Sequence, residues 1–190
     1  MMVNSSTNDV IPQAAVAVIE TGPNPPTPEQ PGFHSHNSIL LLERTADDRD
    51  PWSGHLAFPG GRIDTSDLSL LHCAIRETFE ECGIQLQEKH MHTVLPSAPA
   101  GRFVAQKTLW VQPFHFYLAE LPDITLQQKE IAAWHLLKVE DFLDPLNHKQ
   151  EAFSHKTPEK LFPCIAVGNK LLWGFTYGVL FRELVAEPSH

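Results

Sequence analysis

The chain has 190 residues, of which 42% are hydrophobic and 19% charged, a composition typical of soluble globular proteins and not of disordered or fibrous ones. Its net charge of -9 argues against nucleic acid as a partner, because a surface that binds a phosphate backbone carries a basic stripe. No apolar run reaches the ~20 residues that cross a bilayer, and the N-terminus lacks the features of a secretory signal, so we expect no membrane partner. The three cysteines have no CxxC spacing and fit a reducing, cytoplasmic compartment.

The pattern of apolar residues predicts a polar, flexible tail over residues 1–13 and a single domain over residues 14–187. Strands are expected at residues 13–20, 38–43, 55–58, 109–118, 131–137, 164–167 and 170–173, the last two forming a hairpin. Pro113 interrupts residues 109–118, which are therefore either a strand pair or one bent strand. Helices are expected from Ser66 or Asp67 to about Cys82, from residue 139, and over residues 174–186. Mixed strands with helices at separate points predict a helix–sheet–helix sandwich.

The first predicted helix has an apolar stripe on one side and charged residues beside it. The stripe consists of Leu71, Ala74, Ile75, Thr78, Phe79 and Cys82. The residues off the stripe are Arg76, Glu77, Glu80 and Glu81. The following Gly83 is a typical helix terminator, so the three glutamates gather at the negative end of the helix dipole.

Glu77, Glu80 and Glu81 are three and four residues apart, which puts them on one helical face. Like charges at that spacing, at that end of a helix, each cost a few tenths to about 1 kcal/mol. A bound divalent cation would reverse the sign of this penalty, so the arrangement indicates a functional site. The alternative, a merely solvated acidic face, is the commoner outcome for an isolated RETFEE sequence.

The residue types around these acids suit one kind of chemistry. Carboxylate oxygens are the ligands that Mg²⁺ and Mn²⁺ prefer, and the Gly60-Gly61 turn lets the backbone approach a ligand closely. The Arg76 guanidinium can pin a carboxylate with two hydrogen bonds. Together these groups suit metal-assisted attack of water on a phosphate or diphosphate. The eleven histidines form no zinc-binding pattern, and the three cysteines are interpreted as buried free thiols.

With the preceding FPGG, this region resembles the Nudix hydrolase motif GX5EX7REUXEEXGU, in which U is bulky and apolar. The matching residues are Gly61, Asp67, Arg76, Glu77, Glu80, Glu81, Gly83 and Ile84. Asp67 stands where the motif has Glu, one extra residue separates it from Arg76, and Thr78 occupies a usually apolar position. These departures leave the R-E-x-x-E-E core intact.

Within that family the chain resembles the coenzyme A diphosphatase branch, which has an LLTxR stretch before FPGG and the same extra residue inside the motif. Here Leu42 replaces the Thr, and the loop from Arg44 to Gly54 is about one residue longer. The segment LLWGFTYGVL near the C-terminus also resembles a W-G-x-T stretch of those proteins.

The resemblance implies an α/β fold, the Nudix α/β/α sandwich with a mixed sheet. It implies Mg²⁺ or Mn²⁺ bound by Glu77, Glu80, Glu81 and the Gly61 carbonyl, with Arg76 orienting a helix carboxylate. The implied substrate is a nucleoside diphosphate linked to another moiety, with coenzyme A or an acyl derivative favoured. ADP-ribose and dinucleotide polyphosphates are the alternatives. A non-catalytic binding module is a third hypothesis, disfavoured because all three motif glutamates are present.

Candidate residues outside the motif follow from the same resemblance. Glu130 precedes a strand at a place where Nudix enzymes often have an additional metal-linked or basic carboxylate. Arg44, with Gly60 and Gly61, is expected to bind the substrate. Further candidates with a solvated surface or packing role as the alternative are Arg49, Trp52, Arg102 and Lys107. Three tryptophans are expected in the core: Trp110, Trp134 and Trp173. The Pro-rich residues 23–31 and the first strand are compatible with a homodimer.

Overall fold

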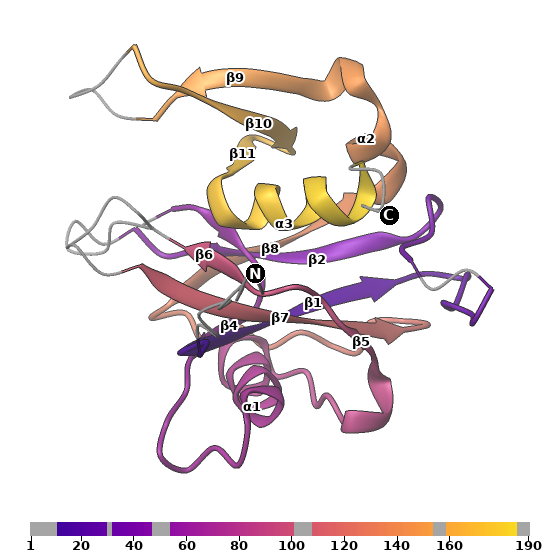
Figure 1. Cartoon of the computed structure of the whole chain (residues 1–190), viewed down its shortest axis with the longest axis vertical. Coiled ribbons are helices and arrows are strands. Elements are labelled where there is room, and N and C mark those ends of the chain that lie inside the picture. Colours follow the sequence, from indigo (N-terminus) through magenta and orange to yellow (C-terminus); the bar gives the residue numbers. More distant parts are fainter. Residues whose placement is uncertain (1–10, 30–31, 47–53, 101–107, 154–158, 186–190) are drawn as a thin grey trace, which may run out of the picture.

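The computed structural model describes residues 11–29, 32–46, 54–100, 108–153 and 159–185. Within these ranges, an eight-stranded sheet lies between one helix on its lower face and two helices with a smaller sheet on its upper face (Figure 1). The main strands are β1 (Ala14–Thr21), β2 (Ser38–Arg44), β3 (Leu56–Ala57), β4 (Gly60–Arg62), β5 (Met91–Val94), β6 (Ala98–Ala100), β7 (Leu109–Leu118) and β8 (Ile131–Lys138). The predicted α/β/α sandwich with a mixed sheet is confirmed.

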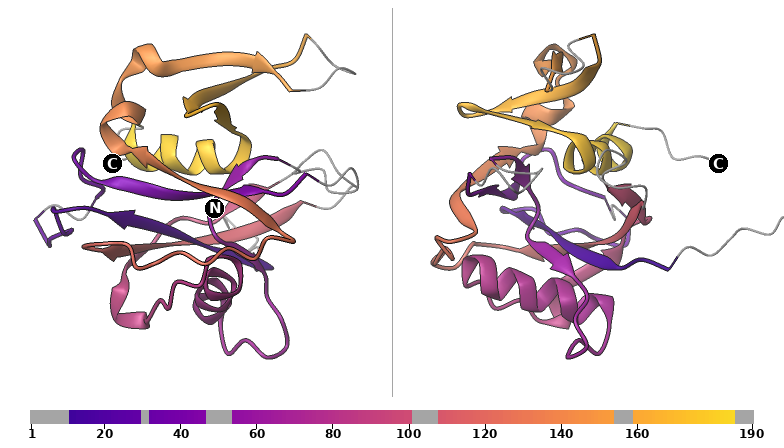
Figure 2. Two further views of the ribbon diagram at one scale, coloured as in Figure 1. Left: turned by 180° about the vertical axis from the view of Figure 1, so that it is seen from behind. Right: turned by 90° about the vertical axis from the view of Figure 1, so that its left-hand side faces the viewer.

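The remaining elements cover the two faces of the main sheet. They are α1 (Leu70–Cys82), η1 (Glu88–His90), α2 (Val139–Leu143), η2 (Pro145–Asn147), β9 (His148–Ala152), β10 (Leu161–Val167), β11 (Lys170–Trp173) and α3 (Gly174–Leu184). Helix α1 and the short η1 lie on one face, whereas α2, α3 and the small sheet β11-β10-β9 lie on the other (Figures 1 and 2).

The main sheet has the order β3-β2-β1-β7-β5, with β4 beside β1, β6 beside β7 and β8 beside β2. Strands β1 and β7 are parallel, and the other pairs are antiparallel. Because successive side chains of a strand point to opposite faces, each central strand contributes side chains to two hydrophobic cores, one on each face of the main sheet. Ala17 and Leu42 pack on the α1 side, whereas Val18 and Leu41 pack on the side of α2 and α3.

Pro113 does not split the segment Leu109–Leu118, which forms one continuous strand. The reason lies in its neighbours. β6 pairs with residues 109–111 and β5 with residues 114–116, so Pro113 falls in the gap between them, where no backbone N–H is required. Its carbonyl still accepts a hydrogen bond from the backbone of Leu95 at 3.1 Å.

The strand and helix predictions hold in type, and the hairpin across residues 168–169 is confirmed. Four short strands, β4, β5, β6 and β9, were not predicted, because they are only three to five residues long and β9 has the polar sequence HKQEA. The expectation for Trp134 was wrong: it is 43% exposed on β8, which pairs only with β2 among the described strands. Trp110 and Trp173 are partly buried.

The start of α1 also differs from the prediction. Ser69 is the N-cap, and its hydroxyl accepts a hydrogen bond from the backbone of His72 at 3.2 Å. Ser66 and Asp67 instead belong to a tight turn, in which the Asp64 carboxylate accepts hydrogen bonds from the backbone and hydroxyl of Ser66. A side-chain turn thus competes with the helix for these residues. The helix ends as predicted, with Gly83 in the left-handed conformation.

Domain boundaries remain a prediction. Residues 1–10 and 186–190 lie outside the described ranges. Gln13, assigned to the tail, donates a hydrogen bond from its backbone to the Trp110 carbonyl and accepts one from Ile63. No helix among the described residues is both long and apolar enough to cross a membrane.

We predict that Gly60→Ala destabilises the protein by several kcal/mol. Gly60 has φ of 150°, and an added Cβ would lie 2.3 Å from the Ala15 carbonyl oxygen and 2.6 Å from the Val16 Cα. Overpacking and a strained backbone typically cost roughly 1–3 kcal/mol each. Chemical denaturation measures the free energy of unfolding.

The matched control is Gly178→Ala on α3, where an added Cβ meets nothing within 4 Å. That change should stabilise the protein by about 0.5–1 kcal/mol, because alanine favours a helix. Equal effects of the two substitutions would contradict the close approach of β4 to β1.

Candidate active site

The acidic residues of α1 lie against the Gly60-Gly61 turn of β4. The Gly60 backbone N–H donates a hydrogen bond to Glu81 Oε2 at 2.9 Å. A Cβ on Gly61 would come within 2.5 Å of the Glu77 carboxyl group, so only glycine lets these groups approach. The turn therefore forms a cradle for two of the three motif glutamates.

The three glutamates differ in burial, and this corrects the predicted helical stripe. Glu81 is 5% exposed, whereas Phe79, which we placed in the core, is 51% exposed. Thr78 is buried as expected, and its hydroxyl donates to the Ala74 carbonyl at 2.7 Å. The buried face of α1 is thus rotated toward Glu81, which brings an acidic side chain into the edge of the core.

Arg76 connects most of the acids. Its Nε and Nη2 donate to the two carboxylate oxygens of Asp67 at 2.9 and 2.8 Å. Its Nη1 donates to Glu77 Oε1 and to Glu80 Oε2, both at 3.0 Å. The bidentate partner of the guanidinium is therefore Asp67, and the helix glutamates share the remaining nitrogen.

Asp67 thereby acquires a definite structural place despite its shifted position in the motif. Its side chain is 3% exposed, and it also accepts a hydrogen bond from the Asp64 backbone at 2.8 Å. The hydrogen bonds from Arg76 hold the pKa of Asp67 at about 2, against the opposing effect of burial. Asp67 is thus a permanently charged anchor for Arg76 near neutral pH.

The negative charges of Glu81 and Glu77 are unfavourable at this site. Burial raises the pKa of Glu81 to about 8, and the charges of Glu77 and Glu130 add to this, against the Gly60 N–H and Arg44. Burial likewise raises the pKa of Glu77, opposed by Arg76 and reinforced by Glu80 and Glu130. Since the charge of Glu130 acts on both, the fold brings this residue near the motif acids.

Glu130 reaches this region because its loop docks on the C-terminus of α1. The backbone N–H groups of Thr125 and Gln127 donate to the carbonyls of Cys82 and Glu81 at 3.0 and 2.9 Å. The Glu130 carbonyl in turn accepts a hydrogen bond from the backbone of Thr45 at 2.7 Å, just after β2. Glu130 is exposed and so is open to solvent and ligands.

Arg44, the last residue of β2, points toward the same acids. Its Nη1 lies 3.9 Å from Glu81 Oε1, and its side chain is 31% exposed. A bulge in the pairing of β2 with β8 falls between Glu43 and Arg44. Bulges commonly re-aim side chains beside active sites. Here β8 enters the α1 side of the core at Ile131, directly after Glu130.

The residues present fit a hard divalent cation such as Mg²⁺ or Mn²⁺. The available donors are carboxylate oxygens and the Gly61 carbonyl, which also accepts a weak hydrogen bond from the Cys73 thiol at 3.6 Å. In the part of the chain that the structure describes, no three His, Cys, Asp or Glu side chains are already arranged as a metal site. Arg76 holds the acids in place, so binding would require small rotations of side chains.

Other candidates lie elsewhere. Arg49, Trp52, Arg102 and Lys107 fall outside the described residues.

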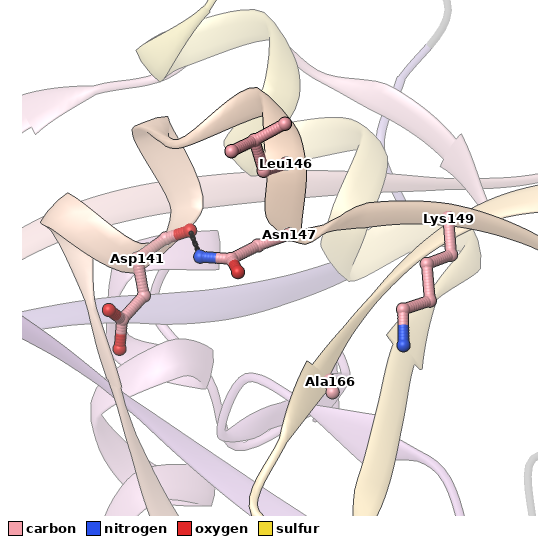
Figure 3. A pocket seen from close by; sticks show the side chains of 5 residues that line it. All are labelled: Asp141, Leu146, Asn147, Lys149 and Ala166. Carbon is pink, nitrogen blue, oxygen red and sulfur yellow. Dashed lines mark hydrogen bonds between the residues drawn. The ribbon is translucent and has the colours of Figure 1, made fainter.

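A surface hollow of about 410 Å³ is lined by Asp141, Leu146, Asn147, Lys149 and Ala166 (Figure 3). It lies on the side of α2 and the small sheet, across the main sheet from α1. It therefore belongs to a different region from the acid cluster.

Comparisons with known proteins bear on this site. The NUDIX domain family matches residues 32–157. Protein C14C4.10c of Schizosaccharomyces pombe is 34% identical over 177 residues, which cover 83% of this chain and 53% of that protein. The chain thus spans about half the length of that relative.

Two further matches are more limited. The mitochondrial coenzyme A diphosphatase NUDT8 of Mus musculus is 43% identical over 42 residues, 22% of this chain and 20% of that protein. The solved structure of a MutT/nudix family protein from Enterococcus faecalis has a TM-score of 0.57 at 16% identity, covering 92% of this chain and 61% of that chain, which shows the fold. The family match over residues 32–157 and the 34% identity to the Schizosaccharomyces pombe protein establish that the chain belongs to the Nudix hydrolase family.

Proposed function

We propose that this chain is a metal-dependent diphosphatase that hydrolyses coenzyme A or acyl-coenzyme A to 3′,5′-ADP and 4′-phosphopantetheine or its acyl derivative. The observation that carries the chemistry is the set of acids around Arg76 and Gly60. The three glutamates supply oxygen donors whose exposure to solvent increases from Glu81, which is buried, through Glu77, which is half-buried, to Glu80, which is exposed. Such a set of acids is costly without a cation and suits the binding of one.

We assign the cation to Glu77, Glu80, Glu81 and the Gly61 carbonyl. When bound, Mg²⁺ or Mn²⁺ would neutralise diphosphate oxygens and lower the pKa of a water molecule. Glu130 is our candidate for accepting the proton of the attacking water, since it is exposed and electrostatically coupled to Glu77 and Glu81. Arg44 is our candidate for binding a substrate phosphate, because its guanidinium extends from the end of β2 toward Glu81.

The preference for coenzyme A rests on sequence similarity near the motif. The stretch before FPGG and the extra residue between Asp67 and Arg76 resemble the coenzyme A diphosphatase branch. The match to a mitochondrial coenzyme A diphosphatase over 42 residues supports the same choice. Cytoplasmic localisation and a homodimer remain predictions from the sequence.

The substrate is tested by incubating the purified protein with Mg²⁺ or Mn²⁺ and a panel of coenzyme A, acetyl-coenzyme A, ADP-ribose, dinucleotide polyphosphates and nucleoside triphosphates. Mass spectrometry identifies the products. We expect 3′,5′-ADP and 4′-phosphopantetheine from coenzyme A. Rapid cleavage of another compound with coenzyme A left intact would refute the coenzyme A assignment, and no cleavage of any compound would favour a binding module.

In the same assay, Glu81→Gln should lower kcat by roughly 10²–10³-fold, the range for loss of one electrostatic contributor to a transition state. The fold should persist without metal, because glutamine, like a protonated glutamate, carries no charge at this buried position. A carboxyl pKa raised to about 8 makes the wild type lose stability as the pH rises from about 4.5 to 8, since the folded state then binds more protons than the unfolded state. The variant should lack this loss.

The control for that variant is Glu151→Gln on β9, an exposed glutamate across the main sheet from α1. It should leave both kcat and the pH dependence of stability unchanged. Near wild-type turnover by Glu81→Gln would contradict the metal assignment.

Asp67→Asn should lower kcat or metal affinity by roughly 10- to 100-fold, the usual cost of removing a group that orients metal ligands. Arg76 would lose the anion that fixes both Nε and Nη2, so its hold on Glu77 and Glu80 would loosen. Steady-state kinetics at several Mn²⁺ concentrations measure both quantities. Asp141→Asn on α2 is the control, and equal kinetics for the two variants would show that Asp67 does not act through Arg76.

A further inference from the structure

A pair of charged groups joins the small sheet to the main sheet directly behind the candidate active site. Glu43 of β2 receives Lys170 of β11, whose Nζ lies 2.7 Å from Oε1. The other carboxylate oxygen, Oε2, lies 3.0 Å from Nε2 of His135 on β8. Glu43, Lys170 and His135, which we call the inter-sheet bridge, thus connect three strands from two sheets.

The bridge is partly buried, which distinguishes it from surface ion pairs. The Glu43 side chain is 14% exposed, His135 is 19% exposed and Lys170 is 34% exposed. Burial alone would raise the pKa of Glu43, but the hydrogen bonds from Lys170 and His135 hold it below its ordinary value. Removal of one partner would leave a charge poorly solvated, which is costly at a buried site.

The position of Glu43 gives this bridge a connection to the site. Side chains alternate along β2, so that Leu41 packs on the side of α3 and Leu42 on the side of α1. Glu43 accordingly meets the small sheet, and Arg44 meets Glu81 at 3.9 Å on the opposite face. The bridge therefore holds the residue next to Arg44 in the chain.

The end of β2 is also held by backbone contacts with β3 and with the residues just before β3. The Arg44 backbone N–H donates to the His55 carbonyl at 3.0 Å, and the Arg44 carbonyl accepts from the Gly54 N–H at 3.2 Å. The regular pairing of Arg44 with β8 is broken by the bulge. The next residue, Thr45, bonds to the carbonyl of Glu130. A shift of this strand end would thus displace both Arg44 and the backbone of Glu130.

We propose that Lys170 and His135 act through Glu43 as positioning residues, holding the end of β2 so that the Arg44 guanidinium stays where it binds a substrate phosphate. This inference rests on the proposed function only in its assignment of a phosphate to Arg44. It gives the small sheet a role in substrate affinity, although none of the bridge residues reaches the acid cluster.

The test compares the affinity for inorganic pyrophosphate in the presence of Mg²⁺, measured by calorimetry, and KM for coenzyme A. Lys170→Met keeps the aliphatic stem and removes the charge. It should weaken pyrophosphate binding and raise KM by roughly three- to tenfold, in line with coupling energies of connected residues, with kcat little changed. Lys170→Arg, which retains the charge, should restore both values.

The control is Lys138→Met. Lys138 also pairs with a glutamate, Glu140 at 3.4 Å, but both side chains are exposed and the pair lies away from the end of β2. It should leave affinity and KM at wild-type values. A double variant of Lys170→Met with Arg44→Ala should bind no more weakly than Arg44→Ala alone, because the bridge acts through Arg44.

The proposal fails if Lys170→Met binds pyrophosphate like the wild type, or if its effect adds in full to that of Arg44→Ala. Absence of pyrophosphate binding by the wild type would also overturn it, because Arg44 would then have no phosphate to hold. Failure of the proposed substrate gives a different result: pyrophosphate affinity responds to the variants as described, while coenzyme A is not cleaved.

Discussion

The site depends on the enforced closeness of several carboxylates to a single guanidinium. Asp67, Glu77 and Glu80 all accept hydrogen bonds from Arg76, so three negative charges face one positive charge. Glu81 lies beside them in the edge of the core, where burial raises its pKa to about 8. The burial of Glu77 and Glu81 beside other acids has a free-energy cost that a bound divalent cation can offset.

Several elements of the fold hold the charged groups of the site close together. β4 passes tightly against β1 because Gly60 has no side chain there, and Gly61 leaves room for the Glu77 carboxylate of α1. The C-terminal carbonyls of α1 are satisfied by a loop that carries Glu130 to the site. On the far face, the inter-sheet bridge secures the strand from which Arg44 extends. The packing of α1 on β4 thus fixes the acids, and the contacts of β2 with the small sheet fix Arg44.

Much of the fold and the motif could be predicted from the sequence, because apolar periodicity and the glycine at the end of α1 are local signals. The rotation of α1 could not, since the burial of Glu81 and the exposure of Phe79 depend on β4 and the loop that packs there. The pairing of Arg76 with Asp67 could not be predicted either. Only the turn at residues 64–67 brings Asp67 back to the helix, and that turn competes with helix formation in a way that spacing along the chain does not reveal.

Thermal unfolding at pH 8 over a series of Mn²⁺ concentrations tests whether the acids of α1 form a divalent-cation site. A cation that binds only the folded state stabilises it by about 2.7 kcal/mol at a hundred times its dissociation constant. We expect binding at this site to raise the unfolding midpoint steadily with Mn²⁺ concentration. A midpoint that is independent of Mn²⁺ over the same range would contradict a cation site at these acids.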